Sequence, residues 1–179
     1  MIQPVLAALL AFYGSFLSVG VPCLALHASA YGRELGAVPG SFGVCLDVGA
    51  AAAREGVPVE VAIAVAYRET RFRGGLVGGG GEIGVLQVKS RWWPEARRNP
   101  LRTGLRALKT CHAFGRQDAL RKCRGRPACR RRILGTSGWR RAVAHYHGGI
   151  APSWGYAERV WVVVEAAGQS GGRNPRSRE

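Results

Sequence analysis

Charged side chains are missing from the first thirty residues of this chain, and acidic side chains are scarce in one long stretch of the rest. No Lys, Arg, Asp or Glu occurs in residues 1–30. Hydrophobic residues nevertheless make up 47% of the 179 residues, which excludes a disordered chain and suits one globular domain with short extensions. No internal repeat is apparent.

The uncharged N-terminal segment has the pattern of a secretory signal peptide, although a basic residue near its start is missing. Apolar and small residues dominate positions 5–26, and Ala28-Ser29-Ala30 forms an A-x-A cleavage site. An uncleaved membrane anchor is the alternative, because about 20 apolar residues span a bilayer. Three residues that break helices favour cleavage: Gly14, Gly20 and Pro22. Both interpretations predict export to the periplasm or the exterior.

Acidic residues are scarce between positions 89 and 141, where 17 Lys or Arg face only Glu95 and Asp118. This segment supplies the whole net charge of +15, and the remainder of the chain is neutral. Such a surface attracts anionic partners: nucleic acid, anionic lipid or anionic wall polymer. A solvated helical face is the other interpretation.

Cysteines are few, and no CxxC pair is present, so a zinc site is disfavoured; His112 stands alone among them. We expect no metal and no cofactor. Cys23 lies in the presumed signal peptide. The other four predict two disulfides in an oxidising compartment, with three possible pairings. We favour Cys45–Cys111 and Cys123–Cys129.

Helical spacing and cap residues predict a mainly α domain. Ser41 can cap a helix that ends at Gly56, and Pro58 suits the first turn of the next helix. Apolar residues recur along this second helix at helical spacing, and Glu69 stands at its end. The run Gly74–Gly81 that follows predicts a flexible loop or tight turn.

Further helices are expected after this loop. The first starts at Asn99-Pro100 and runs to about Phe114, and short basic helices follow around the second cysteine pair. Ser137 and Ser153 can cap the last two, which end at Gly168. We therefore divide the chain into four segments: a signal peptide or anchor (1–30), a linker (31–40), a folded domain (41–168) and a disordered tail (169–179).

Glu69 is the strongest candidate for a chemical role. A carboxyl group at the end of an apolar helix, beside a glycine-rich loop, is placed for a raised pKa, because burial disfavours its charged form. An acid that stays protonated near neutral pH can donate its proton. Taken alone the position is weak evidence, since Arg68 and Arg71 offer ordinary ion pairs to a surface carboxylate.

Four sequence blocks in a fixed order strengthen this hypothesis. They are Tyr67–Phe72 with Gly84–Val88, Asn99–Leu108, Ala142–Gly149 and Tyr156–Val160. The blocks resemble Glu-Ser-x-Phe with Gly-Leu-Met-Gln, the Asn-Gly-leucine helix, Ala-x-x-x-Tyr-Asn-x-Gly and Tyr-x-x-x-Val of the lytic transglycosylases in the soluble lytic transglycosylase and goose-type lysozyme superfamily. Together they cover nearly the whole chain after residue 42.

The resemblance implies a lysozyme-like single domain, with the glycine-rich loop between the catalytic helix and the rest. It implies cleavage of peptidoglycan glycan strands with Glu69 as the one catalytic acid, and products that end in 1,6-anhydro-muramic acid. Gln87 and Tyr146 would hold the sugar or the glutamate. Four further residues fall among the implied substrate contacts: Thr70, Glu82, His147 and Tyr156.

Several positions depart from the family pattern. Thr70 replaces Ser, and Val85-Leu86 replaces Leu-Met, both conservatively. His147 stands where Asn is common and is either a hydrogen-bonding, pH-sensitive group or a structural histidine. Glu82 stands where a small residue is common; it either orients a water molecule for an inverting hydrolysis or is a loop acid that answers nearby cations.

A narrower resemblance points to family members that serve secretion systems and pili. It rests on Cys45 and on the run Gln87–Trp92. Tryptophans of such clefts either stack on sugars or pack in the core, and Trp92, Trp93 and Trp154 are not separable by sequence.

Three functions compete with the lytic transglycosylase. A hydrolytic muramidase of the same fold would use Glu69 with Glu82. A non-catalytic wall-binding scaffold would not need the glutamate in its matched context. A nucleic-acid-binding protein is disfavoured by export and by the lack of helix-turn-helix, RNA-recognition and zinc-finger patterns. We expect the basic segment 89–141 to bind anionic wall polymer or a membrane surface.

Overall fold

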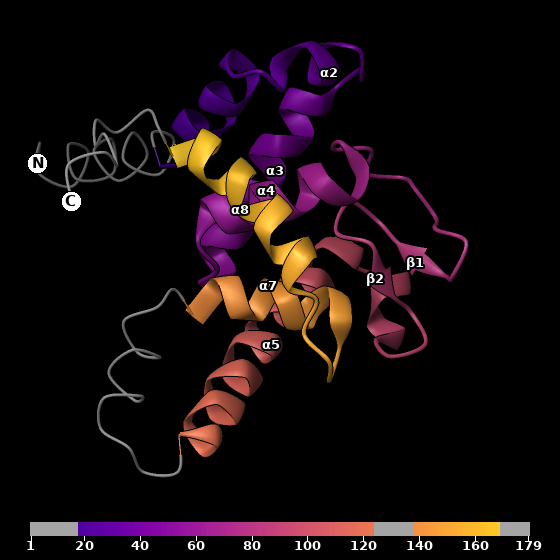
Figure 1. The fold of residues 1–179 in the computed structure, drawn as a ribbon. Helices are drawn as coiled ribbons and strands as arrows, with labels where there is room; N and C mark the ends of the chain where they lie inside the picture. The colour runs from indigo at the N-terminus through magenta and orange to yellow at the C-terminus, as the bar shows by residue number, and fades with distance from the viewer. Residues whose placement is uncertain (1–17, 124–137, 169–179) are drawn as a thin grey trace, which may run out of the picture.

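The chain folds into a mainly helical structure with one small hairpin (Figure 1). A computed structural model describes residues 18–123 and 138–168. Residues 18–28 are helical. The labelled elements are α2 (Gly32–Gly36), α3 (Ser41–Glu55), α4 (Val59–Thr70), β1 (Glu82–Ile83), β2 (Val88–Lys89), the 3₁₀ helix η1 (Pro94–Arg97), α5 (Pro100–Lys122), α7 (Gly138–Gly148) and α8 (Trp154–Gly168).

Helix α4 lies at the centre of the core. Every residue from Val61 to Tyr67 is buried, because α3 and α8 pack against this helix from different sides (Figure 1). Helices α5 and α7 pack on each other below this group, and the end of α5 projects away from the body (Figure 1). Burial all round explains why α4 has almost no polar face until Arg68 and Glu69.

The predicted helix ends are mostly confirmed. Gly56 ends α3 in the left-handed conformation, and Asn99 caps α5 by accepting a hydrogen bond from the backbone N–H of Arg102 at 3.1 Å. Ser41 is not the predicted cap. Its hydroxyl donates to the carbonyl oxygen of Leu35 at 2.9 Å and so ties α3 to α2. Helix α5 continues past the expected end to Lys122.

The glycine-rich segment leads into an antiparallel hairpin in which Glu82 pairs with Lys89 and Ile83 with Val88. Helix α5 packs directly against the turn of this hairpin. A Cβ at Gly104 would lie 2.7 Å from the side chain of Leu86, so only glycine allows this approach. The contact fixes the turn relative to α5.

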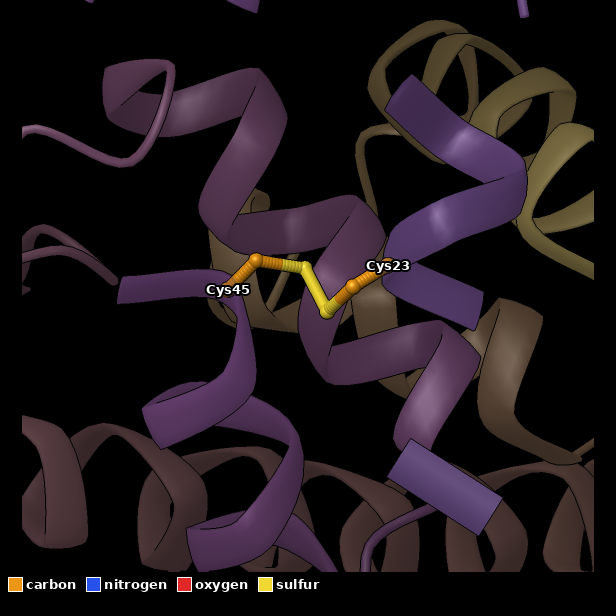
Figure 2. Close-up of a disulfide and its surroundings, with 2 residues drawn as sticks. All are labelled: Cys23 and Cys45. Atoms are coloured by element: carbon orange, nitrogen blue, oxygen red, sulfur yellow. A yellow bond between two sulfur atoms is a disulfide. The ribbon is translucent and has the colours of Figure 1, made fainter. Parts of the chain in front are cut away.

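The N-terminal segment is part of the fold. Cys23 forms a disulfide with Cys45, and both are fully buried (Figure 2). The predicted Cys45–Cys111 pairing is therefore wrong, and Cys111 is a free thiol. The helix over residues 18–28 packs beside the start of α3, which brings Cys23 next to Cys45. Cys111 lies on α5 and lines a cleft instead. Cys123 is disulfide-bonded.

Several predictions about the chain's ends remain open. Cys129, residues 1–17 and the tail 169–179 lie outside the described residues, as does Ser137, so the Cys123–Cys129 pairing stays a prediction. Cleavage after Ala30 also stays a prediction, and it would remove Cys23 and leave Cys45 unpaired.

The segment 31–40 differs from the expected linker, because it contains α2 with Leu35 fully buried. It also contacts the end of α4. The carboxylate of Glu34 accepts hydrogen bonds from the Tyr67 hydroxyl at 2.5 Å and from Arg71 at 3.0 Å. Within residues 18–123 and 138–168, no helix combines the length and the hydropathy that crossing a bilayer requires.

Candidate active site

An open cleft of about 820 Å³ contains most of the predicted site residues. It lies between the end of α4, the hairpin, the middle of α5 and the end of α7. Its lining combines both candidate carboxylates with aromatic side chains and a lysine; the residues include Glu69, Glu82, Gln87, Lys89, Trp92, Trp93, Cys111, Tyr146, His147 and Ile150.

Glu69 stands in the last turn of α4 and reaches this cleft from the core side. Burial raises the pKa of Glu69, and the negative charge of Glu82 raises it further. Two groups oppose these effects: the Tyr156 hydroxyl, which donates to Oε1 of Glu69 at 2.5 Å, and the positive charge of Arg68. The balance is a raised pKa, which favours a protonated Glu69 that faces the cleft.

Thr70 and Tyr156 lie behind the cleft wall and not in it. The Thr70 hydroxyl is 3.1 Å from the carbonyl oxygens of Ala66 and Val85, so it joins the end of α4 to the hairpin. Tyr156 is only 6% exposed and reaches Glu69 from α8. Thr70 and Tyr156, which the resemblance implies as substrate contacts, therefore contact Glu69 and the backbone around it.

The arginines that flank Glu69 do not form the ordinary ion pair that the sequence allowed. Arg71 ends α4 in the left-handed conformation, with φ at 53°. Its guanidinium pairs with Glu34 and lies over the ring of Tyr67. Arg71 is therefore paired with a residue of α2, and Arg68 is the basic neighbour that lowers the pKa of Glu69.

Gln87 and Tyr146 hold the hairpin turn opposite Glu69. The side-chain amide of Gln87 donates to the carbonyl oxygens of Gly84 and Leu76 at 2.9 and 3.2 Å. The Tyr146 hydroxyl donates to the carbonyl oxygen of Leu86 at 2.7 Å. Burial, followed by the charge of Glu69, raises the pKa of Tyr146 well above its ordinary value, so the phenol stays a donor.

Glu82 is held as a carboxylate by the hairpin itself. Its own backbone N–H and that of Gly80 donate to the side chain, and Lys89 lies across the strand pair at 3.6 Å; together they lower the pKa of Glu82. A Cβ at Gly78 would lie 2.6 Å from the Glu82 carboxylate. The loop backbone thus passes close to this carboxylate, and the interpretation as a loop acid is favoured.

The three tryptophans separate clearly in the structure. Trp92 is 67% exposed and lines the cleft, with the guanidinium of Arg91 4.8 Å from its ring centre. Trp93 lines the same cleft and also packs against the core. Trp154 lies at the start of α8 beside Arg141. Only the first two are placed to meet a ligand in the cleft.

Lys89 and Cys111 also line the cleft, and the sequence does not predict either of them as a cleft residue. Lys89 was counted only as part of the basic segment, although its pairing opposite Glu82 follows once the hairpin is recognised. Cys111 was assigned to a disulfide, whereas its free thiol lines the cleft and burial raises its pKa to about 11. A thiol with that pKa stays protonated and is a weak nucleophile.

Across the part of the chain that the structure describes, no group of three or more His, Cys, Asp or Glu is arranged to hold a metal ion. Two carboxyl groups share an open cleft with aromatic residues in its lining, and their pKa values are shifted in opposite directions, up for Glu69 and down for Glu82. No protein-family model, curated protein or solved structure matches this chain.

Proposed function

We propose that this protein is a peptidoglycan lytic transglycosylase of lysozyme-like fold that cleaves the β-1,4 bond between N-acetylmuramic acid and N-acetylglucosamine. The observation that carries the proposal is Glu69, a carboxyl group with a raised pKa that faces an open cleft at the end of a buried helix. The sequence blocks that resemble the family surround this same cleft.

In the first step Glu69 donates its proton to the glycosidic oxygen. The C1–O bond breaks, the N-acetylglucosamine side leaves as an alcohol, and an oxocarbenium-like centre develops at C1 of the muramoyl sugar. The raised pKa serves this step because it favours the protonated form of the acid to higher pH than for an ordinary glutamic acid. The 2.5 Å hydrogen bond from Tyr156 orients the carboxyl group.

In the second step Glu69, now a carboxylate, takes the proton from the 6-hydroxyl of the same muramoyl sugar. The 6-oxygen attacks C1 and closes the 1,6-anhydro ring, and Glu69 regains its proton. No water is consumed, and no second carboxylate is required. Gln87 and Tyr146 keep the hairpin turn in place opposite Glu69 while the sugar is bound.

A hydrolytic muramidase is the second candidate, and one observation favours it. Glu82 lines the same cleft as Glu69 and raises the pKa of Glu69 by its charge. A carboxylate there could orient a water molecule for attack on C1, which would give a reducing end. Its bonds to Gly80 and Lys89 weigh against this role, because they engage the oxygens that would hold the water.

A pair of variants tests the acid role of Glu69 through pH dependence. Tyr156→Phe removes a hydrogen bond that lowers the pKa of Glu69, so the alkaline limb of kcat/KM moves to higher pH. Glu82→Gln removes a charge that raises this pKa, so the limb moves to lower pH. Initial rates on peptidoglycan across a pH series measure both.

Shifts of the two limbs in the same direction would contradict this assignment. The Glu82→Gln variant also separates the two candidate reactions: a transglycosylase keeps its activity with a shifted limb, whereas a hydrolase that needs Glu82 as its base loses it.

We propose that the basic segment 89–141 holds the enzyme to anionic wall polymer or to a membrane surface, and that no nucleic acid is bound. Exposed cations along the described part of this segment include Arg97, Lys109 and Arg116. Export to the periplasm or exterior and local opening of the wall for a secretion or pilus machine complete the proposal; they rest on the sequence patterns.

Added salt is expected to weaken binding to whole peptidoglycan sacculi more than it weakens cleavage of short soluble glycans. The reason is that mobile ions screen exposed charges, whereas proton transfer from the largely buried Glu69 is little affected. Sedimentation of the protein with sacculi and turnover of a soluble glycan, measured over one salt series, give the comparison. An equal loss of both would contradict the role of the basic segment.

A further inference from the structure

His147 touches the group that contacts the candidate acid. It is the tenth residue of the eleven in α7, where the resemblance would place Asn. Its imidazole lies nearly parallel to the ring of Tyr156, with ring centres 4.2 Å apart and 14° between the planes. Helices α7 and α8 pack on each other, so the stack joins the ends of two packed elements.

Tyr156 carries this contact to Glu69. The phenol ring is stacked against His147 on one face, and its hydroxyl donates to Oε1 of Glu69 at 2.5 Å. A tyrosine hydroxyl moves through a wide arc when the ring turns about its side-chain bonds. A flat neighbour against the ring face restricts that motion, and His147 is exposed on its other side toward the cleft.

Partial burial and the nearby cations both favour the neutral form of the His147 ring. Partial burial lowers the pKa of His147, and the cations that face it, Arg159 on α8 and Lys89 on β2, lower it further. Lys89 is itself ion-paired with Glu82 at 3.6 Å. A neutral imidazole stacks on the phenol without placing a positive charge beside the Glu69 carboxyl group, which would otherwise favour loss of its proton.

We propose that His147 is a positioning residue of the active site: its ring fixes the ring of Tyr156, so that the Tyr156 hydroxyl keeps its hydrogen bond to Glu69. The catalytic consequence rests on the proposed function, whereas the contact itself does not. An Asn at this position has no ring and could not stack on Tyr156. The stack therefore depends on the histidine that this chain has at position 147.

The direct test is a pH titration of Glu69, monitored by NMR of ¹³C-labelled glutamate carboxyl groups. The Glu69 signal is the one that is absent from the spectrum of Glu69→Gln. His147→Ala frees the phenol and is expected to move the Glu69 titration to higher pH, in the same direction as Tyr156→Phe. His147→Phe keeps a flat ring and is expected to reverse most of this shift.

A matched control is available at the other side of α7, where α5 packs against it. His112 stacks on Trp139 with ring centres 4.3 Å apart and 15° between the planes, and it does not line the cleft. His112→Ala removes the same kind of contact and should leave the Glu69 titration in place. A Glu69 titration at lower pH in His147→Ala would show that His147 acts by excluding water and would overturn the proposal. An equal shift in His147→Phe would overturn it as well.

Kinetics give the second readout. His147→Ala is expected to lower kcat on a soluble glycan about tenfold with little change in KM, because the acid is misplaced and not the substrate. His147→Phe should recover most of this loss. A rise in KM alone would assign His147 to sugar binding and overturn the positioning role. If the wild type releases no product, the proposed function fails, and the NMR titration still decides the contact.

Discussion

Replacing Glu69 with Gln is expected to reduce the release of soluble fragments from purified peptidoglycan by about 10³-fold. Gln keeps the shape of the side chain and can still accept the hydrogen bond from Tyr156, but it has no proton of suitable acidity to give to the leaving oxygen. The loss should therefore appear in kcat, with substrate binding retained. Release of dye from labelled sacculi measures the rate.

The matched control is Glu165→Gln on α8, the same substitution at an exposed site. This variant should retain wild-type activity. Thermal unfolding of both variants excludes a folding defect as the cause. A Glu69→Gln protein that is folded and retains more than a tenth of the wild-type rate would contradict the assignment of Glu69 as the acid.

Removing the Cys23–Cys45 disulfide by the double change to Ala is expected to lower the free energy of unfolding by about 3 kcal/mol. The bridge closes a loop between residues 22 positions apart in the sequence, and both cysteines are fully buried in the core. Loss of the cross-link frees the unfolded chain, and loss of buried sulfur weakens packing. Urea unfolding of the full chain measures the change.

Cys111→Ala is the control, because this cysteine is a free thiol at the cleft and closes no loop. Its effect on the free energy of unfolding should be clearly smaller. If the double variant is as stable as the wild type, the cross-link to residues 18–30 contributes nothing to the stability of the fold. That result would favour the interpretation of this segment as a leader that is removed after export.

The helical framework follows from local signals in the sequence. The apolar run before Glu69 predicts a buried helix, and α4 is buried from Val61 to Tyr67. Gly56 ends α3 in the left-handed conformation that glycine adopts readily, and the Asn99 side chain caps the start of α5. Such features depend on neighbours within one or two turns, and a single sequence carries that information.

The N-terminal arrangement could not be predicted in this way. A signal peptide and a buried helix have similar hydropathy, so the apolar run around Cys23 predicts a leader as readily as a core helix. The partner of Cys45 depends on which helix packs beside α3, which is a tertiary property. The role of Glu34 at the end of α4 is likewise set by a contact between segments 33 residues apart.

The sequence predicts which residues line the candidate site better than it predicts the contacts between them. Gln87, Glu82, Tyr146 and His147 share the cleft with Glu69, as the resemblance implied. The sequence gives no sign that Tyr156 approaches Glu69 from behind, or that His147 stacks on Tyr156, because these contacts join α4, α7 and α8. The hairpin was hidden because its strands have only two residues each.

The most direct measurement is mass spectrometry of the soluble products that the wild-type protein releases from purified peptidoglycan, before and after treatment with borohydride. The proposed reaction predicts muropeptides that end in 1,6-anhydro-muramic acid, lighter than the hydrated products by one water and unchanged by borohydride. They should be absent with Glu69→Gln. Products with reducing ends that gain two hydrogens on treatment would contradict the account and assign the protein as a hydrolase.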